Sequence, residues 1–297
     1  MANALQTPLL SVQGLTMRFG GILALSDVGF VVRQGSVTAL IGPNGAGKTT
    51  LFNCVTGFYR ATAGTINFDA GDGTVDLIKV LGEPFKPGDF TNPSAFAERL
   101  YFKMFGGSHR VARAGVARTF QNIRLFKEMT AIENLLAAQH MQLNRNLVSG
   151  VLNTKGYRTS EREAVDRAYA WLKVFGLERD ANRLAGELPY GHQRHLEIAR
   201  AVCTNPRMVC LDEPAAGLNP KETEELSGLI RRLRDEHDIT VLLIEHDMGL
   251  VMGISDYVVV LDYGKVIAKG SPKAVEKDPA VLAAYLGEDH AGGEAEL

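Results

Sequence analysis

The sequence has little cysteine, almost no net charge and no long apolar run, and each shortage excludes a class of protein. Its 297 residues contain three widely spaced cysteines, Cys54, Cys203 and Cys210. Three such cysteines supply neither a disulfide framework nor a zinc site of the usual spacing, which favours a reduced, cytosolic setting. A formal net charge of −2 argues against a nucleic-acid-binding protein.

Membrane-spanning and export signals are also missing. No apolar run approaches the roughly 18 residues that a spanning helix needs. The first ten residues, MANALQTPLL, lack the basic and apolar regions of a signal peptide. We therefore expect a soluble chain that reaches a membrane only through a partner.

Apolar strands alternate with helices outside a central block that is mostly helical. This alternation predicts an α/β fold whose sheet is mostly parallel and covered on both faces. The predicted strands lie at 9–17, 28–32, 36–41, 64–68, 115–121, 208–214, 240–247 and 257–262. The predicted helices lie at 48–57, 160–175, 191–204 and 220–236, with a further one around 132–136.

These elements divide the chain into four parts. We expect a first part of the core at 1–123, a helical subdomain at 124–205, a second part of the core at 206–286 and a disordered tail at 287–297. An irregular insertion at 69–108 is either a decorated edge remote from any chemistry or a contact surface. We expect the first, and the second is supported by the many aromatic residues of the insertion: Phe85, Phe90, Phe96, Tyr101 and Phe105.

The segment GPNGAGKTT matches the pattern G-x-x-x-x-G-K-[ST] of a phosphate-binding loop, or P-loop. It follows a predicted strand and opens a predicted helix, which is the context that this motif requires. Backbone N–H groups of such a loop surround phosphate oxygens, Lys48 neutralises the β- and γ-phosphates, and the Thr49 hydroxyl binds Mg²⁺. The nucleotide-binding residues predicted here are Gly42, Pro43, Asn44, Gly45, Ala46, Gly47, Lys48, Thr49 and Thr50.

Two acidic residues end the apolar segment MVCLDEP. Asp212 fits a residue that holds Mg²⁺ at the end of a neighbouring strand. Glu213 fits a group that orients or deprotonates an attacking water. The alternative is a pair of acids that caps a strand–helix turn, but the P-loop favours the catalytic interpretation.

A histidine and a glutamine end two further predicted strands. His246 lies in the polar stretch that ends TVLLIEHD, where it could reach a γ-phosphate bound at a neighbouring strand. Gln121 ends GVARTFQ, and its amide could contact the metal or the attacking water. Each residue alone is equally typical of a solvated turn, so both assignments depend on the other motifs.

The stretch LPYGHQRHLEIARA, residues 188–201, starts a helix without an ordinary cap. Pro189 has no N–H group, and neither Pro189 nor Tyr190 offers a capping side chain. The free N–H groups of such a helix end attract an anion. His192 and His195 share the first turns, but no third ligand supports a metal site, so we expect solvated or phosphate-facing histidines.

Together these motifs resemble the ATP-binding subunits of ABC transporters. The resemblance covers about 9–287 except 69–108. The segments ARTFQNIRLF, LEIARA, DEPAAGLNPKETEEL and LLIEHDMGLVMGISD are similar to the subgroup that imports branched-chain amino acids. The resemblance implies a P-loop NTPase core with a mostly parallel sheet, an antiparallel β portion, an inserted helical subdomain, and ATP and Mg²⁺ as ligands, with Thr49, Gln121 and Asp212 around the metal.

The resemblance also implies partners. In this family the helix after the signature motif points at the γ-phosphate of ATP held by a second subunit, in a homo- or heterodimer. It further implies a transmembrane permease that docks on the helical subdomain at the cytoplasmic face of the membrane, and, indirectly, a periplasmic or extracellular solute-binding protein. The residues implied in nucleotide contacts are Phe19, which would stack on adenine, and Leu188, Pro189, Tyr190, Gly191 and His192, which would complete the partner's site.

The signature stretch departs from the general pattern Leu-Ser-Gly-Gly-Gln. Pro189 replaces the serine, Tyr190 the first glycine and His192 the glutamine, while Asn219 replaces the usual aspartate in the loop that contacts the other subunit. The Gly191 amide and the helix end remain, and a helix end stabilises an anion by roughly 0.3–1 kcal/mol. A weaker closed dimer, or a non-catalytic subunit, stays open as an alternative.

The resemblance implies ATP hydrolysis coupled to uptake of branched-chain or related amino acids. The alternatives are uptake of urea or amides, export of lipid or lipopolysaccharide, and a non-transport ATPase. The last class usually has tandem cassettes or a long coiled-coil insertion, which this sequence lacks. The motifs cannot name the solute, because the solute does not touch this kind of chain.

Overall fold

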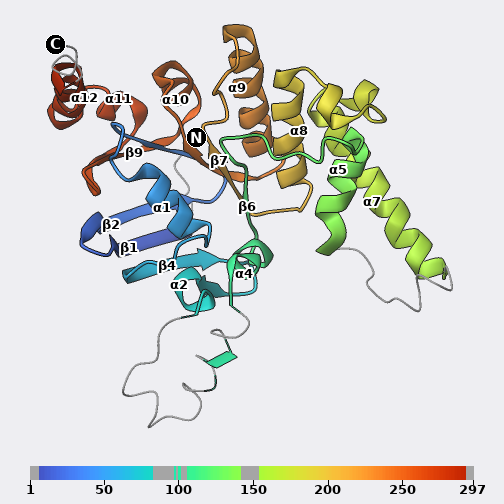
Figure 1. Cartoon of the computed structure of the whole chain (residues 1–297), viewed down its shortest axis with the longest axis horizontal. Helices are drawn as coiled ribbons and strands as arrows, with labels where there is room; N and C mark the ends of the chain where they lie inside the picture. Colours follow the sequence, from blue (N-terminus) through green and yellow to red (C-terminus); the bar gives the residue numbers. More distant parts are fainter. Residues whose placement is uncertain (1–6, 83–96, 98–99, 102–105, 142–153, 292–297) are drawn as a thin grey trace.

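Two sheets organise the molecule in the computed structural model, which describes residues 7–82, 97, 100, 101, 106–141 and 154–291 (Figure 1). The smaller sheet is antiparallel, with strand order β2-β1-β4-β5. The larger sheet has the order β10-β9-β3-β8-β7-β6, in which all neighbours are parallel except β10 and β9. The predicted fold, a mostly parallel sheet with an antiparallel β portion, is confirmed.

The strands are β1 Pro8–Phe19, β2 Ile22–Arg33, β3 Val37–Ile41, β4 Ala63–Asp69, β5 Thr74–Asp76, β6 Val116–Arg118, β7 Met208–Asp212, β8 Thr240–Ile244, β9 Tyr257–Asp262 and β10 Lys265–Gly270. The helices are α1 Lys48–Val55, α2 Leu77–Val80, α4 Ser108–Arg113, α5 Ala131–Ala138, α7 Lys155–Val174, α8 Tyr190–Val202, α9 Pro220–Asp235, α10 Met248–Ile254, α11 Pro272–Val275 and α12 Pro279–Ala291. Short 3₁₀ turns lie at Gln139–Met141, Glu178–Asp180 and Ala185–Glu187. Among the described residues, no helix is both long and apolar enough to cross a bilayer.

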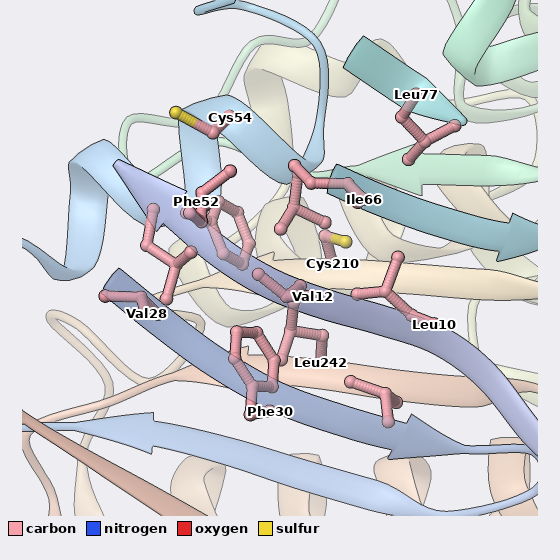
Figure 2. Packing of buried hydrophobic residues seen from close by; sticks show 14 of the residues in the cluster. Leu10, Val12, Val28, Phe30, Phe52, Cys54, Ile66, Leu77, Cys210 and Leu242 are labelled. Carbon is pink, nitrogen blue, oxygen red and sulfur yellow. The ribbon is translucent and has the colours of Figure 1, made fainter. Parts of the chain in front are cut away.

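The central strands of the larger sheet are buried on both faces. Every residue of β3, β7 and β8 is buried, as continuous apolar strands in a parallel sheet should be. On one face, Phe52 of α1 packs among Val12, Val28 and Ile66 of the antiparallel sheet (Figure 2). This packing fixes α1, and with it the P-loop, against the ends of the strands.

The opposite face is covered by α8 and α9, with α5 and α7 beyond them (Figure 1). Helices α5, α7 and α8, here called the helical block, therefore share one hydrophobic cluster with the sheet instead of forming a separate core. The single tryptophan, Trp171 of α7, lies with its ring centroid 4.7 Å from that of His237, in the loop that precedes β8. This ring pair joins the helical block to the part of the chain that carries the sheet.

Several predicted boundaries differ from the structure by a few residues, and two of these differences have a clear physical cause. The strand expected at 115–121 ends at Arg118, because the carbonyl groups of Phe120 and Gln121 accept hydrogen bonds from Arg194 and do not continue the ladder with β7. The tail expected to be disordered from residue 287 onward is helical as far as Ala291. One glycine inside a segment rich in alanine and leucine costs only about 1 kcal/mol of helix stability, which is too little to end the helix.

The insertion at 69–108 is only partly described. It begins with β5 and α2, and is thus more regular than predicted. Tyr101 is exposed, with the Arg110 guanidinium 4.7 Å from its ring centroid. The other aromatic residues on which the contact-surface interpretation depends lie outside the described residues: Phe85, Phe90, Phe96 and Phe105.

The loop that joins β6 to α5 is held by a buried asparagine. Asn134 of α5 accepts a hydrogen bond from the Phe126 amide (2.9 Å) and donates to the Phe126 and Thr130 carbonyl groups (both 3.0 Å). Thr130 also caps α5 in a reciprocal pair with Glu133. One side chain therefore fixes the end of the segment that carries Gln121.

Asn134→Ala should lower the free energy of unfolding by roughly 1–3 kcal/mol, because it leaves the Phe126 amide without its partner and removes two hydrogen bonds to carbonyl groups. Chemical denaturation of the two proteins measures this difference. The matched control is Asn182→Ala at an exposed position, which should change stability by no more than about 0.5 kcal/mol. Equal effects of the two substitutions would contradict the proposed function of Asn134.

Candidate active site

The P-loop lies between the end of β3 and the start of α1 and is closely packed. Gly42 has φ 146°, and a Cβ there would overlap the carbonyl oxygen of Leu261. Gly47 has φ 100°, and a Cβ there would lie 2.9 Å from the Ala24 carbonyl oxygen. Both positions therefore require glycine for their backbone conformation and for the close approach of β2 and β9. Gly47 offers no side-chain cap to α1, which leaves the start of that helix suited to an anion.

Lys48 is buried and bends back over the loop. Its Nζ donates to the carbonyl oxygens of Gly42 (2.6 Å) and Pro43 (2.7 Å). Thr49, the next residue, is exposed, as are Asn44 and Gly45 at the tip of the loop. The loop thus presents an open face with a lysine ammonium directly behind it.

Glu213 is the centre of a second cluster, at the carboxyl ends of β6, β7 and β8. Its Oε2 accepts a hydrogen bond from Gln121 Nε2 (2.8 Å), and its Oε1 lies 2.6 Å from His246 Nε2. The three residues follow three adjacent strands of the sheet. The structure therefore brings together side chains that are 33 and 92 residues from Glu213 in sequence.

The backbone of Glu213 is held in an uncommon conformation. Its φ of 46° lies in the left-handed region, which costs a non-glycine residue of the order of 1–3 kcal/mol. Its amide donates to the Ile244 carbonyl oxygen of β8 (3.0 Å). This turn aims the carboxylate across the ends of the strands toward Gln121 and His246.

Asp212, one residue earlier, is paired with an arginine that the sequence analysis did not single out. Arg118 Nη2 lies 2.9 Å from Asp212 Oδ2, and the Arg118 guanidinium lies over the rings of Phe52 and Phe120. Burial raises the pKa of Asp212, and the hydrogen bond and charge of Arg118 oppose that effect. The only sequence signal for Arg118 is one cation inside the otherwise apolar strand GVARTF.

Glu245 is a second residue that the sequence analysis missed. It is buried, and it accepts hydrogen bonds from the amides of Ala215 (2.7 Å) and His246 (3.0 Å). Burial raises the pKa of Glu245, while these backbone hydrogen bonds oppose the rise. Glu245 thus ties the loop after β7 to the loop after β8, and so fixes Glu213 relative to His246.

The signature turn, residues 188–192, lies at the start of α8. Pro189 is the N-cap residue and supplies no side-chain cap. The Tyr190 hydroxyl donates to the Ala216 carbonyl oxygen (3.2 Å), and His192 Nδ1 lies 3.2 Å from Asp180 Oδ2. These contacts are with the loops around α8 and α9 and not with the P-loop of the same chain.

Gly191 has a steric reason to be glycine. A Cβ at this position would lie 2.8 Å from Glu222 Oε1, in the capping box that starts α9. Asn219 is the other member of that capping box. The signature turn and the loop at 215–219 are therefore packed against each other.

His195 is buried, so the expectation of a solvated histidine is wrong for this residue. Its ring is stacked on that of His192, with 6.4 Å between centroids. Burial is the largest cause that lowers the pKa of His195, and the neighbouring His192 adds to it. Burial therefore disfavours the charged form of this imidazole.

Phe19 ends β1 with its side chain 42% exposed, in edge-to-face contact with Tyr59 (5.3 Å between centroids). It pairs with Ile22 across the turn between β1 and β2. Two residues further along β2, the Ala24 carbonyl oxygen packs against Gly47 so closely that no Cβ fits there. The hairpin that carries this exposed ring is therefore the one that packs against the P-loop through Ala24.

A phosphate-binding loop between a strand and a helix, with carboxylates at the end of a nearby strand of the same sheet, defines the class of P-loop nucleoside triphosphatases. Within that class, a sequence model of the family described as "ABC transporter" matches residues 25–216. A second model, described as "Branched-chain amino acid ATP-binding cassette transporter", matches residues 265–291. The chain belongs to the ABC transporter family, as an ATP-binding subunit that hydrolyses ATP.

Relatives match almost the whole chain. The high-affinity branched-chain amino acid transport ATP-binding protein BraF of Pseudomonas aeruginosa is 52% identical over 95% of this chain and 98% of that protein. The LivG protein of the same description from Escherichia coli is 50% identical over the same shares. A crystal structure of the ADP conformation of MJ1267, an ATP-binding cassette of an ABC transporter, is 32% identical, with a TM-score of 0.71 over 95% of this chain and 99% of that one.

The buried His195 predicts a pH dependence of stability. Because its pKa is lowered from 6.5 in the folded chain, the unfolded chain binds a proton that the folded chain does not, and stability falls as the pH drops below about 6.5. Between pH 8 and pH 5.5, the wild-type protein should therefore lose more free energy of unfolding than His195→Gln, in denaturation series at both pH values. The control is His109→Gln at an exposed position, which should follow the wild type; parallel losses in all three proteins would contradict the assignment.

Proposed function

We propose that the chain hydrolyses ATP to power the import of branched-chain or related amino acids through a membrane permease. The observation that carries the catalytic part is the contact of Glu213 with both Gln121 and His246 at the strand ends beside the P-loop. The solute class is supported by relatives described as branched-chain amino acid transport proteins over nearly their full length.

The P-loop would hold the nucleotide. Its amides and Lys48 would bind the phosphates, since the ammonium lies behind the open face of the loop and would exchange its carbonyl oxygens for phosphate oxygens. Phe19 would stack on the adenine ring, because it is exposed on the hairpin whose strand β2 packs against Gly47.

The donors around the P-loop fit a magnesium ion. A hydroxyl (Thr49), a carboxylate (Asp212) and an amide oxygen (Gln121) are the oxygen ligands that Mg²⁺ prefers. Arg118 fixes the orientation of Asp212 toward this position. The chemistry that Mg²⁺ supplies when bound is neutralisation of charge on the β- and γ-phosphates.

Glu213 would accept a proton from the attacking water. Hydrogen bonds to both carboxylate oxygens fix its direction, and Gln121 and His246 would exchange these contacts for the metal and the γ-phosphate when ATP is present. Glu245 would keep the two loops in place during this exchange.

The signature turn would complete the site of a second subunit, in a homo- or heterodimer. The uncapped start of α8 is suited to the γ-phosphate of ATP bound to the partner. Tyr190 and His192 are tied to Ala216 and Asp180, so the Gly191 amide and the helix end are what this turn offers an anion. The chain would attach to the cytoplasmic face of the membrane through its permease, with a solute-binding protein on the other side.

Glu213→Gln should reduce kcat for ATP hydrolysis at least about 100-fold, because the amide cannot accept the proton of the water. Binding of ATP should persist, and ATP should accumulate with the protein in a dimer on size-exclusion chromatography. The matched control, Glu236→Gln, changes an exposed glutamate of a surface ion pair and should leave kcat unchanged. An unchanged kcat in Glu213→Gln would remove this residue from its proposed role.

Uptake by cells that lack this chain tests the solute. Wild-type chain supplied in trans should restore uptake of labelled leucine, and Glu213→Gln should not. Labelled urea and short amides serve as comparison solutes in the same cells. Restored uptake of urea with no change for leucine would reject the proposed solute class and leave the ATPase intact.

A further inference from the structure

Among the residues that the structure describes, Arg194 is the largest wholly buried side chain, and it joins α8 to the segment that carries Gln121. Its Nη1 donates to the Phe120 carbonyl oxygen (2.9 Å) and its Nη2 to the Gln121 carbonyl oxygen (2.8 Å). The planar fork of the guanidinium therefore presents one nitrogen to each of two consecutive carbonyl groups in a fixed geometry, which a lysine ammonium on its flexible stem does not provide.

Glu197, one turn further along α8, contacts both Arg194 and the same segment. One of its carboxylate oxygens accepts from Arg194 Nη1 (2.8 Å), and the other accepts from the Arg124 amide (3.2 Å). The ion pair thus holds residues 120–124 at both ends. All three hydrogen bonds to this segment reach its backbone, so they fix its position whatever its side chains are.

Stability alone explains this pair poorly. Replacing a buried ion pair by apolar residues of similar size is often neutral or stabilising. Arg194 also keeps its Nε buried without a hydrogen-bond partner, so the guanidinium satisfies the segment at the expense of one of its own donors. What the pair supplies, and apolar residues would not, is a defined position for the Gln121 backbone.

The side chain of Gln121 reaches Glu213 only if the Gln121 backbone is held in this position. It lies beyond the end of β6, so the sheet does not hold it, and its side chain must reach Glu213 Oε2. The helix that holds it is also the helix whose first turn is the signature turn, one turn before Arg194.

We propose that Arg194, together with Glu197, is a positioning residue for ATP hydrolysis, which fixes the Gln121 backbone to α8 and so ties this chain's own catalytic cluster to the turn it presents to its partner. The proposal rests on the proposed role of Gln121. A shift of about 1 Å in a positioned group lowers a rate by as much as about 100-fold, so loss of the tie reduces kcat rather than affinity for ATP.

Two variants separate positioning from folding. Arg194→Lys keeps the buried charge but lacks the rigid fork that holds the Phe120 and Gln121 carbonyl groups in one fixed geometry. The double variant Arg194→Met/Glu197→Met removes both charges, so that neither is left buried alone. The matched control is Arg232→Met, in which an arginine of α9 loses an exposed ion pair with Glu236 and a hydrogen bond to the Val174 carbonyl oxygen.

Steady-state ATP hydrolysis and melting temperature are measured for each protein. We expect kcat to fall about tenfold in Arg194→Lys and in the double variant, with KM for ATP within about twofold of the wild type. The control should keep both values. A wild-type kcat in either Arg194 variant that still melts cooperatively would overturn the proposal; if the double variant does not fold, Arg194→Lys decides alone.

A double-mutant cycle with Gln121→Ala separates positioning from a general structural effect. If Arg194 acts through Gln121, adding Arg194→Lys to Gln121→Ala lowers kcat no further. If the two act independently, tenfold effects multiply to about 100-fold, and that result overturns the proposal. A wild-type kcat in Gln121→Ala alone would instead show that the proposed role of Gln121 fails, and the inference with it.

Discussion

The parallel ladder of β6, β7 and β8 is the constraint on which the site depends. The carboxyl ends of parallel strands lie at one edge of a sheet. Gln121, Glu213 and His246 therefore lie at the same edge although they are far apart in the chain. The ladder alone does not bring their side chains into contact. Contact requires the left-handed turn at Glu213 and the hydrogen bonds of Glu245 to the two following loops.

Buried charges recur wherever a loop must be held near this edge. Arg118 holds Asp212, Glu245 holds the loops after β7 and β8, and Arg194 with Glu197 holds the segment after β6. Each arrangement carries a cost of desolvation, seen in the raised pKa values of Asp212, Glu197 and Glu245. Hydrogen bonds have direction and apolar contacts do not, which explains why these loops are held by polar side chains in a hydrophobic surrounding.

The sequence predicted the parts of the fold and site that depend on local pattern. Continuous apolar segments such as VTALI and TVLLI gave the buried strands, and the spacing of glycine, lysine and threonine at 42–50 gave the P-loop between a strand and a helix. The sequence did not predict the roles of Arg118, Arg194 and Glu245, because their partners lie on other elements and no spacing in the sequence reveals them. Tyr190 shows the same limit: the sequence shows only that a glycine is missing, whereas the fold gives its hydroxyl a partner in the loop before α9.

The ring pair of Trp171 and His237 gives the molecule a built-in optical reporter. The chain has one tryptophan, so its entire indole emission comes from α7 in the helical block. The imidazole beside it belongs to the loop that leads into the sheet, and indole emission is sensitive to such a neighbour. Any rotation of the helical block against the sheet would therefore change the native fluorescence of the protein, without a label and without a substitution.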